Sequence, residues 1–293
     1  MKILISDPFS KDLPQRLRKF GEVTDDKNEI PDADVILVRS ATKVDKTFID
    51  KAKKMKMVIR GGVGLDNIDV AYCNKKGIIV KNTPEASTIA VAELTFALML
   101  GIIRNMVKAH NSMKNGQWAK DMKGSELCGK TLGIIGLGRI GTEVAKRAKA
   151  FGMNIIAYEK YNTQFACAEI VSFDELLRRS DFISLHVPLT DETNEMINRK
   201  SIKKMKDGIV LINTARGKLV NENDLAEALG SGKVRYAGLD VYQQEPPANS
   251  PLLALENVML TPHLGAQTFE NMERISDTIC TIINDFKKSN PKV

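Results

Sequence analysis

The sequence has little of what builds a disulfide scaffold, a base-stacking surface or a membrane span. It has only four cysteines in 293 residues, with no C-x-x-C pair, which argues against a disulfide framework or a zinc site. These are Cys73, Cys128, Cys167 and Cys280. Aromatic residues make up 5% of the chain, and its most apolar stretch, 89–103, is shorter than the ~20 residues of a spanning helix. We therefore expect a cytoplasmic protein with reduced thiols, no metal and no membrane partner.

The positive charge also lacks a pattern typical of nucleic-acid binding. The chain has 43 Lys and Arg against 36 Asp and Glu, a formal net charge of +7, but both signs are interspersed throughout. No basic block, helix-turn-helix or zinc-finger motif accompanies the charge. We expect no nucleic-acid partner, and the charge favours small anionic ligands. The amino terminus reaches Asp7 and Pro8 too early for a signal peptide.

Short apolar runs alternate with amphipathic segments along most of the chain, which is typical of β-α-β units with a parallel sheet. In the first third the predicted strands are 2–6, 35–38, 57–60 and 78–81, with helices near 11–20 and 45–54. Further strands are predicted near 131–135, 155, 182–185, 209–212, 236–240 and 258–260. Because 293 residues suit two domains, we predict an α/β protein with two open parallel sheets.

Residues 89–113 are predicted to form one long helix, which follows Pro84 and a capping Ser87 or Thr88. Its first four turns are apolar nearly all the way round, so it must be buried on most sides. We expect it to cross into the second domain and to help form a homodimer through region 88–113. Glu93 within it then needs a polar partner. A last amphipathic helix, 266–287, can return to the first domain.

The segment 131–141 predicts a dinucleotide site, because a short strand leads into G-x-G-x-x-G and then a helix. Gly136 makes the tight turn, Gly138 lets the backbone approach the phosphates, and Gly141 lets the helix pack closely on the strand. The phosphates would lie at the positive end of the helix that begins near Arg139.

A second strand, 154–158, ends at Glu159, close to the ~20-residue offset at which a carboxylate binds the adenosine ribose hydroxyls. A carboxylate there repels a 2′-phosphate, so it favours NAD over NADP. Lys160 weakens that preference. The alternative is that Glu159 is an ordinary surface residue at a strand end.

Three side chains of complementary chemistry follow predicted strands, at the edge where open parallel sheets bind ligands. They are Arg216, Glu245 and His263, after the strands 209–212, 236–240 and 258–260. A histidine exchanges a proton near neutral pH, a carboxylate on its second nitrogen fixes the tautomer, and a guanidinium binds a substrate carboxylate. Beside a nicotinamide these groups suit oxidation of a hydroxyl. His186, at another strand end, is the rival acid/base, whereas His110 lies in a polar helix segment.

With these motifs, the chain resembles the D-isomer-specific 2-hydroxyacid dehydrogenases over nearly its whole length. Within that family it is most similar to the D-3-phosphoglycerate dehydrogenases, in the short form without a regulatory domain. The matching stretches are 38–44, 64–69, 82–84, 129–141, 213–217, 239–241 and 262–266.

The resemblance implies that Arg216 orients the substrate, that His263 is the acid/base and that Glu245 pairs with the histidine. Asp240 would hold the nicotinamide carboxamide. The full set of expected NAD contacts is Gly136, Gly138, Arg139, Ile140, Gly141, Tyr158, Glu159, His186, Val187, Pro188, Thr193, Thr214, Ala215, Arg216, Asp240, His263, Gly265 and Ala266.

The substrate contacts are expected in the first domain. The loop 61–64 offers successive backbone N–H groups that can bind a carboxylate, although Gly62 departs from the alanine common in the family. A substrate phosphate would need cations. The expected contacts are Arg39, Ser40, Arg60, Gly62, Val63 and Gly64, with Lys120 and Lys123 as further donors from a neighbouring subunit.

The family fold implies a Rossmann dinucleotide-binding domain inserted into a flavodoxin-like substrate domain. We place the substrate domain at 1–95, the NAD domain at 96–266, and the returning helix at 267–293. The implied activity is NAD-dependent oxidation of 3-phospho-D-glycerate to 3-phosphohydroxypyruvate, the entry to serine. A glyoxylate or hydroxypyruvate reductase is the alternative within the class, and a dinucleotide-sensing binding protein is the alternative outside it.

Overall fold

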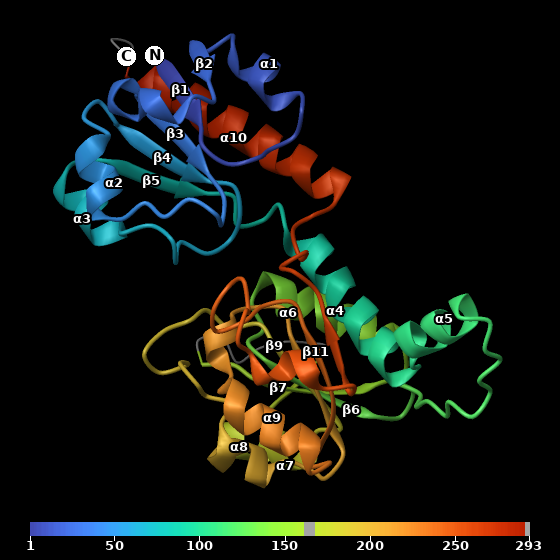
Figure 1. The fold of residues 1–293 in the computed structure, drawn as a ribbon. Helices are drawn as coiled ribbons and strands as arrows, with labels where there is room; N and C mark the ends of the chain where they lie inside the picture. Colours follow the sequence, from blue (N-terminus) through green and yellow to red (C-terminus); the bar gives the residue numbers. More distant parts are fainter. Residues whose placement is uncertain (161–167, 291–293) are drawn as a thin grey trace. The chain divides into compact units, whose positions relative to one another are not determined.

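The computed structural model describes residues 1–160 and 168–290. The chain divides into two compact units, each built around one parallel sheet (Figure 1). Unit 1 consists of Met1–Ser87 and Ala266–Val293, and unit 2 of Thr88–Gly265. The predicted fold class, α/β with two open parallel sheets, is confirmed. The predicted boundary at 95–96 falls inside a helix of unit 2.

Unit 1 contains a five-stranded parallel sheet in the order β2-β1-β3-β4-β5, the order of flavodoxin-like domains. The strands are β1 (Lys2–Ile5), β2 (Glu22–Thr24), β3 (Val35–Val38), β4 (Met57–Arg60) and β5 (Ile79–Asn82). Every residue of β3 and β4 is buried, because helices cover both faces of a parallel sheet.

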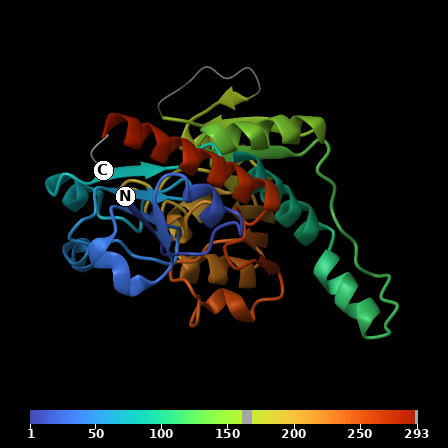
Figure 2. The ribbon, with the colours of Figure 1, turned by 90° about the horizontal axis from the view of Figure 1, so that it is seen from above.

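The two faces of that sheet are covered by helices from distant parts of the chain. The helices are α1 (Leu13–Leu17), η1 (Lys27–Asp32), α2 (Lys46–Lys51), α3 (Val70–Lys75) and α10 (Phe269–Ser289). One face packs α1 and α10, whose Ile275, Ile279 and Ile283 are fully buried against Ile3 and Leu37. The other face packs α2 and α3. Figure 2 shows α10 along its full length.

Unit 2 contains a seven-stranded parallel sheet in the order β12-β11-β10-β9-β6-β7-β8. The strands are β6 (Thr131–Ile135), β7 (Asn154–Tyr158), β8 (Glu169–Ile170), β9 (Phe182–Leu185), β10 (Ile209–Asn213), β11 (Val234–Leu239) and β12 (Val258–Leu260). Counted from β6, this is the Rossmann order with one further strand at the edge.

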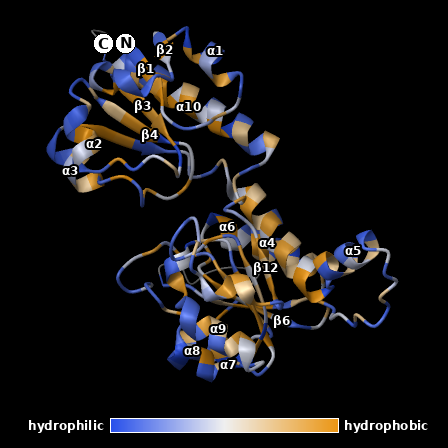
Figure 3. Cartoon of the chain, viewed as in Figure 1, coloured by the Kyte–Doolittle hydropathy of each residue, from blue (hydrophilic) through white to orange (hydrophobic). Residues whose placement is uncertain are grey.

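Helices cover both faces of the unit 2 sheet as well. One core contains α4 (Thr88–Ile103) and α6 (Arg139–Ala150), and the other contains α7 (Phe173–Arg179), α8 (Arg199–Lys204) and α9 (Glu222–Gly230). Two short 3-10 turns, η2 (Gly217–Leu219) and η3 (Pro251–Ala254), lie in loops. The apolar residues of the strands and of α4 stand out in Figure 3.

The prediction of one long helix over 89–113 is wrong. The chain breaks at Asn105, whose φ of 52° is left-handed, and α5 (Met106–Lys114) leaves the axis of α4 at 64°. Glu93 lies on the exposed side of α4, and its carboxylate is 3.6 Å from Arg147. The apolar pattern of the sequence continues across the break, so it gave no sign of the bend.

Two expectations about composition can be compared with the structure. Among the described residues, no single helix is long and apolar enough to cross a membrane, although α4 and α5 pass that test together as a bent pair. Cys73, Cys128 and Cys280 are free thiols. Cys167 lies outside the described residues.

Candidate active site

The glycine loop between β6 and α6 has a shape that requires glycine at two of its three glycine positions, Gly136 and Gly141. Gly136 has a φ of 94°, and a Cβ there would lie 2.8 Å from the carbonyl oxygen of His186. At Gly141 a Cβ would lie 2.0 Å from the carbonyl oxygen of Gly136. At Gly138, the N-cap of α6, a Cβ would meet no atom within 4 Å. The loop is therefore closed on its inner side and open in front of Gly138, which fits a bound pyrophosphate.

Glu159 follows β7 and lies against this loop. Its Oε2 accepts a hydrogen bond of 2.7 Å from the backbone N–H of Leu137, and the N–H of Gly136 donates to the carbonyl of Tyr158 at 2.9 Å. A carboxylate has about four acceptor positions, so capacity is left for the ribose hydroxyls. Arg139 and Ile140 open α6. The residues present thus fit the adenosine half of NAD.

The end of β9 forms the neighbouring wall. His186 Nε2 is 2.8 Å from Ser184 Oγ, and Val187 packs where a side chain at position 136 would lie. Burial lowers the pKa of His186 to about 3, so its ring is neutral at physiological pH. Thr193 Oγ1 donates to the carbonyl of Pro188 at 2.7 Å and folds the following loop back. A neutral, half-buried ring suits the wall of a cofactor site better than proton exchange.

The turn after β10 carries Arg216. Asn213, the last residue of the strand, closes this turn: its Nδ2 donates to the Arg216 carbonyl at 2.9 Å and its Oδ1 accepts from Ala215 N at 3.0 Å. Thr214 Oγ1 is 3.0 Å from Thr95 Oγ1 of α4. The half-buried Arg216 also donates from Nη1 to the Ala215 carbonyl at 2.7 Å.

Asp240 follows β11 and is fully buried. Its carboxylate accepts hydrogen bonds from Thr261 Oγ1 at 2.6 Å, Leu264 N at 2.6 Å and Gly265 N at 2.8 Å. Burial raises the pKa of Asp240 despite these bonds. In this structure the carboxylate braces the turn that carries His263, and the carboxamide contact implied by the resemblance stays a prediction.

His263 lies at the centre of that turn in a left-handed conformation, with φ 56°. Its Nδ1 is 2.7 Å from Glu245 Oε2, and the two side chains are 34% and 38% exposed. Burial acts to raise the pKa of Glu245, but the hydrogen bond and charge of His263 and the charge of Arg216 outweigh it, so that pKa is lowered. An ionised carboxylate only accepts, so Nδ1 carries the proton and Nε2 of the neutral ring is an acceptor. Arg216, Glu245 and His263 therefore form one group in unit 2.

The predicted substrate contacts lie in unit 1, where the structure gives the two arginines different surroundings. Asp7 shapes the turn 39–42 by accepting from Arg39 N at 2.6 Å and from Thr42 Oγ1 at 2.6 Å. The Arg39 guanidinium makes only long contacts, 3.5 Å to the carbonyl of Pro8 and 3.4 Å to Gln267 Oε1. Ser40, in the same turn, is exposed. Arg39 can therefore reorient towards an anion.

Arg60 is 8% exposed and folds back over its own loop. Its Nη1 donates to the carbonyl of Gly64 at 2.5 Å, and a Cβ at Gly62 would lie 3.0 Å from Nη1. Val63, between these glycines, is 37% exposed. The guanidinium thus supports the loop 61–64, which places it behind the predicted anion site.

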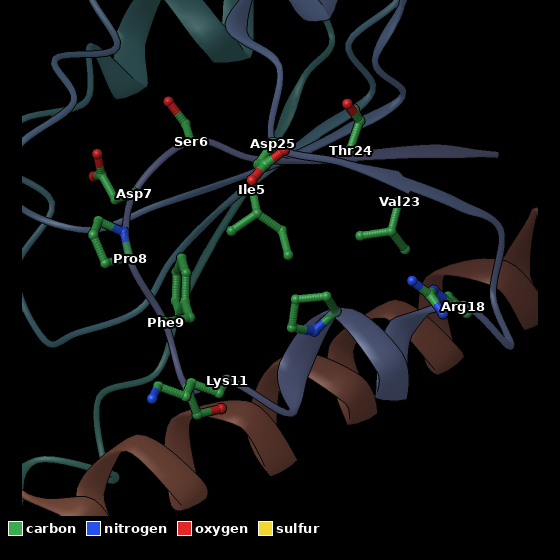
Figure 4. Close-up of a pocket in the computed structure, with 12 residues that line it drawn as sticks. Ile5, Ser6, Asp7, Pro8, Phe9, Lys11, Arg18, Val23, Thr24 and Asp25 are labelled. Carbon is green, nitrogen blue, oxygen red and sulfur yellow. The ribbon is translucent and has the colours of Figure 1, made fainter.

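A cavity of about 540 Å³ opens at the carboxyl ends of β1 and β2 in unit 1. Figure 4 shows the apolar side chains of Ile5, Phe9 and Val23 along it, with Lys11 and Arg18 at its margins. Of the described residues that line it, none is a predicted substrate contact. We assign it no part in the chemistry.

The sequence interpretation missed side chains that hold the predicted ones in place. Ser184 contacts His186, and Glu222 contacts the loop that carries Glu245. Tyr242 contacts the turn that carries His263, and Thr261 contacts Asp240. Thr261, two residues before His263 and directly after β12, could have been found from its position. Ser184, in β9, lies two residues before His186, whereas Glu222 and Tyr242 depend on contacts between distant segments.

Residues 96–265 match the family model described as D-isomer specific 2-hydroxyacid dehydrogenase, NAD binding domain. The matched segment covers more than half of the chain and includes the glycine loop, Arg216, Glu245 and His263. The chain belongs to this family. Its unit 2 is accordingly an NAD-binding domain.

Two relatives are equally similar in sequence. The D-3-phosphoglycerate dehydrogenase of Methanocaldococcus jannaschii is 50% identical over 95% of this chain, which spans 56% of that relative. The hydroxypyruvate reductase of Thermotoga maritima is 50% identical over 94% of both chains. The structure of D-lactate dehydrogenase from Aquifex aeolicus, complexed with NAD and lactic acid, has a TM-score of 0.89 and 34% identity and covers 100% of this chain and 97% of that one.

Proposed function

We propose that this protein catalyses the reversible NAD-dependent oxidation of a D-2-hydroxyacid, with 3-phospho-D-glycerate as the substrate. The observation that carries the proposal is the 2.7 Å contact between His263 Nδ1 and Glu245 Oε2, with Arg216 near enough to lower the pKa of that carboxyl. This contact lies in the same unit as the NAD-binding loop. The arrangement supplies an acid/base, a group that fixes its tautomer, and a cation for the substrate carboxylate.

The chain's own residues account for the proton. With Nδ1–H directed at Glu245, Nε2 of His263 is the atom left to accept the hydroxyl proton of the substrate. The imidazolium formed then lies 2.7 Å from an ionised carboxylate, which stabilises it. Arg216 offers a fork of N–H donors to the carboxylate of the substrate. The glycine loop and Glu159 would hold NAD, which would supply the acceptor for a hydride from the carbon that bears this hydroxyl.

The choice of a phosphorylated substrate has the support of Arg39 and of the M. jannaschii relative. Hydroxypyruvate reduction is the second candidate, because the T. maritima relative is just as identical and matches along almost its full length. The test is an initial-rate panel of NADH with 3-phosphohydroxypyruvate, hydroxypyruvate, glyoxylate and pyruvate. We expect the highest kcat/KM with 3-phosphohydroxypyruvate. A higher kcat/KM for hydroxypyruvate would instead identify the protein as a hydroxypyruvate reductase. NADH binding without turnover of any of the four 2-oxoacids would favour a dinucleotide sensor.

We further propose a homodimer formed through α5 and the segment that follows it. This region exposes large apolar side chains: Met106 at 59%, Val107 at 51%, Met113 at 53% and Trp118 at 71%. Such a group of exposed side chains is typical of a protein interface. Light scattering should give twice the mass of the chain, and Trp118→Ser should reduce it. Phe269→Ser, at a residue 94% exposed in unit 1, is the matched control, and a monomeric wild type would refute the dimer.

In that dimer, Lys120 and Lys123 are candidate donors to the substrate phosphate of the neighbouring subunit. Lys120 Nζ lies 5.6 Å from the centre of the Trp118 ring. If Trp118 lies at the interface, the Lys120 ammonium group therefore lies there as well. Lys120→Ala should then raise KM for 3-phosphohydroxypyruvate more than for hydroxypyruvate. Equal effects on the two substrates would remove this residue from the proposal.

A further inference from the structure

The loop 241–250, which carries Glu245, has no helix or strand of its own. It leads from the end of β11 to η3, and Glu245 is 38% exposed near its middle. The only hydrogen bond that Glu245 receives within this loop is a long one of 3.3 Å, from Tyr242 N to Oε1. The position of the Glu245 carboxylate therefore depends on how the two ends of the loop are held.

One carboxylate outside the loop holds both ends. Glu222 is the first residue of α9 and is 8% exposed. Its Oε1 accepts from Gln243 N at 2.6 Å, and its Oε2 accepts from Ser250 Oγ at 2.5 Å. Gln243 and Ser250 lie on either side of Glu245 in the sequence. No cation among the described residues pairs with Glu222, so its buried charge depends on these two donors and on the positive end of α9.

A second set of contacts fixes the first end of the loop more firmly. The side chain of Gln243 donates from Nε2 to Glu195 Oε1 at 3.1 Å and to the carbonyl of Val220 at 3.0 Å. Val220 and Glu222 are two residues apart, so backbone and side chain of Gln243 are bound by the same short segment. The carboxylate of Glu222 thus completes a fixed attachment point for the loop.

Tyr242 connects this attachment to the rest of the candidate site. Its hydroxyl donates to the carbonyl of Thr261 at 3.0 Å, in the turn that carries His263. A Cβ at Gly217 would lie 1.9 Å from the carbonyl carbon of Tyr242, so the backbone after Arg216 packs directly on this residue. The three segments that carry the predicted catalytic side chains therefore meet at Tyr242.

We propose that Glu222 is a positioning residue for the proposed dehydrogenase reaction, acting through Glu245 on His263. Among the described residues, no hydrogen bond or ion pair joins Glu222 to His263 or Arg216, and its carboxylate accepts from Gln243 and Ser250 of the loop that carries Glu245. Without it, the half-buried N–H of Gln243 and the hydroxyl of Ser250 lose their acceptor, and the loop no longer holds the Glu245 carboxylate 2.7 Å from His263 Nδ1. This inference rests on the proposed function.

The experiment compares Glu222→Ala with Glu222→Gln in steady-state kinetics and NADH binding. We expect Glu222→Ala to lower kcat about tenfold, a rise of about 1.4 kcal/mol in activation free energy, with the Kd of NADH unchanged. Glu222→Gln should keep most of kcat, because the amide oxygen can accept from Gln243 N while its NH2 donates to Ser250 Oγ. Glu227→Ala is the matched control, since Glu227 lies on the same helix, is 64% exposed and pairs with Arg199.

A double-mutant cycle separates positioning from general stability. In a Glu245→Gln background, Glu222→Ala should lower kcat by less than about twofold, because the group through which it acts is already lost. An equal loss in both backgrounds, or an unchanged kcat in the wild-type background, would overturn the proposal. If Glu222→Ala does not fold, Ser250→Ala removes one of the two donors and is read in the same cycle, with the same outcomes.

Turnover by the wild-type protein distinguishes a failure of this inference from a failure of the proposed function. A wild-type protein that turns over no 2-oxoacid with NADH refutes the dehydrogenase and, with it, the role of Glu222. A wild-type protein that is active, with additive effects in the cycle, refutes the role of Glu222 alone.

Discussion

The two glycines at the start of α6 provide a sharp test of the cofactor site, because the structure predicts opposite results for the same substitution. At Gly138 a Cβ would meet no atom within 4 Å, and the backbone angles of φ −66° and ψ −164° are open to any residue. At Gly141 a Cβ would lie 2.0 Å from a backbone oxygen, whereas ordinary contacts begin at 3.4 Å. The overlap is 3.4 − 2.0 = 1.4 Å, between atoms that cannot rotate away from each other.

Gly138→Ala should therefore change the free energy of unfolding by no more than about 1 kcal/mol, since the loss at the N-cap is offset by a less flexible unfolded chain. Its methyl group occupies the space where the pyrophosphate would lie. We expect the Kd of NADH to rise at least about tenfold, which is ~1.4 kcal/mol. Gly141→Ala should lower stability by about 2 kcal/mol, or roughly 4–8 °C in Tm for a unit of this size.

The assay is a fluorescence titration with NADH beside a thermal unfolding curve for each variant. The comparison is internal, because both substitutions add the same methyl group to the same loop. Wild-type NADH affinity in Gly138→Ala would refute the placement of the phosphates. A Tm of Gly141→Ala equal to that of the wild type would refute the close packing of α6 on β6.

Four further predictions follow from the site. His263→Ala should lower turnover by at least ~10²-fold while NADH binding persists; retained turnover would refute its role. Glu159→Ala should weaken NAD more than NADP, which inhibition constants for the two cofactors would measure. Arg39→Ala should raise KM for 3-phosphohydroxypyruvate more than for hydroxypyruvate, whereas Arg60→Ala should raise KM for both substrates by the same factor. The reverse result would assign the phosphate contact to Arg60 and the support of the loop to Arg39. Burial and nearby carboxylates raise the pKa of Tyr242 to about 12. Its neutral hydroxyl therefore contributes stability below the ordinary pKa of 10.0, and this contribution is lost as the pH rises through about 12. Tyr242→Phe should remove part of the alkaline loss of stability measured by urea unfolding, and identical pH dependence in both proteins would contradict this.

The parts of the fold that the sequence predicted are those in which local pattern and tertiary structure agree. Strands such as β3 and β10 each contain four consecutive large aliphatic residues and are buried on both faces. The sequence interpretation overlooked β2 and β8, which are three and two residues long. Such short edge strands contain charged residues and form only because a neighbouring strand offers its hydrogen bonds.

The break between α4 and α5 could not be read from hydrophobicity. Met106 and Val107 continue the apolar pattern of α4 past Asn105, yet both are more than half exposed. The residue that indicates the break is Asn105 itself, because asparagine adopts the left-handed region more readily than most residues with a Cβ.

The candidate site divides in the same way. The glycine loop could be predicted because turn, close approach and packing all lie within 131–141. The contact of His263 with Glu245 could only be hypothesised, since it depends on a left-handed histidine and on a loop held from α9. The place of Arg60 at a strand end predicts a phosphate contact, which stays a prediction; the structure shows its guanidinium donating to the carbonyl of Gly64.

The composition of unit 1 from both ends of the chain has a consequence for its biosynthesis. Its core needs Ile275, Ile279 and Ile283 of α10 against the sheet formed by residues 2–82. The ribosome makes α10 only after residues 88–265, so the sheet formed by residues 2–82 has one apolar face uncovered while the whole of 88–265 emerges. The sheet formed by residues 2–82 is thus completed only after unit 2 has been made, and until then its uncovered apolar face exposes the growing chain to aggregation.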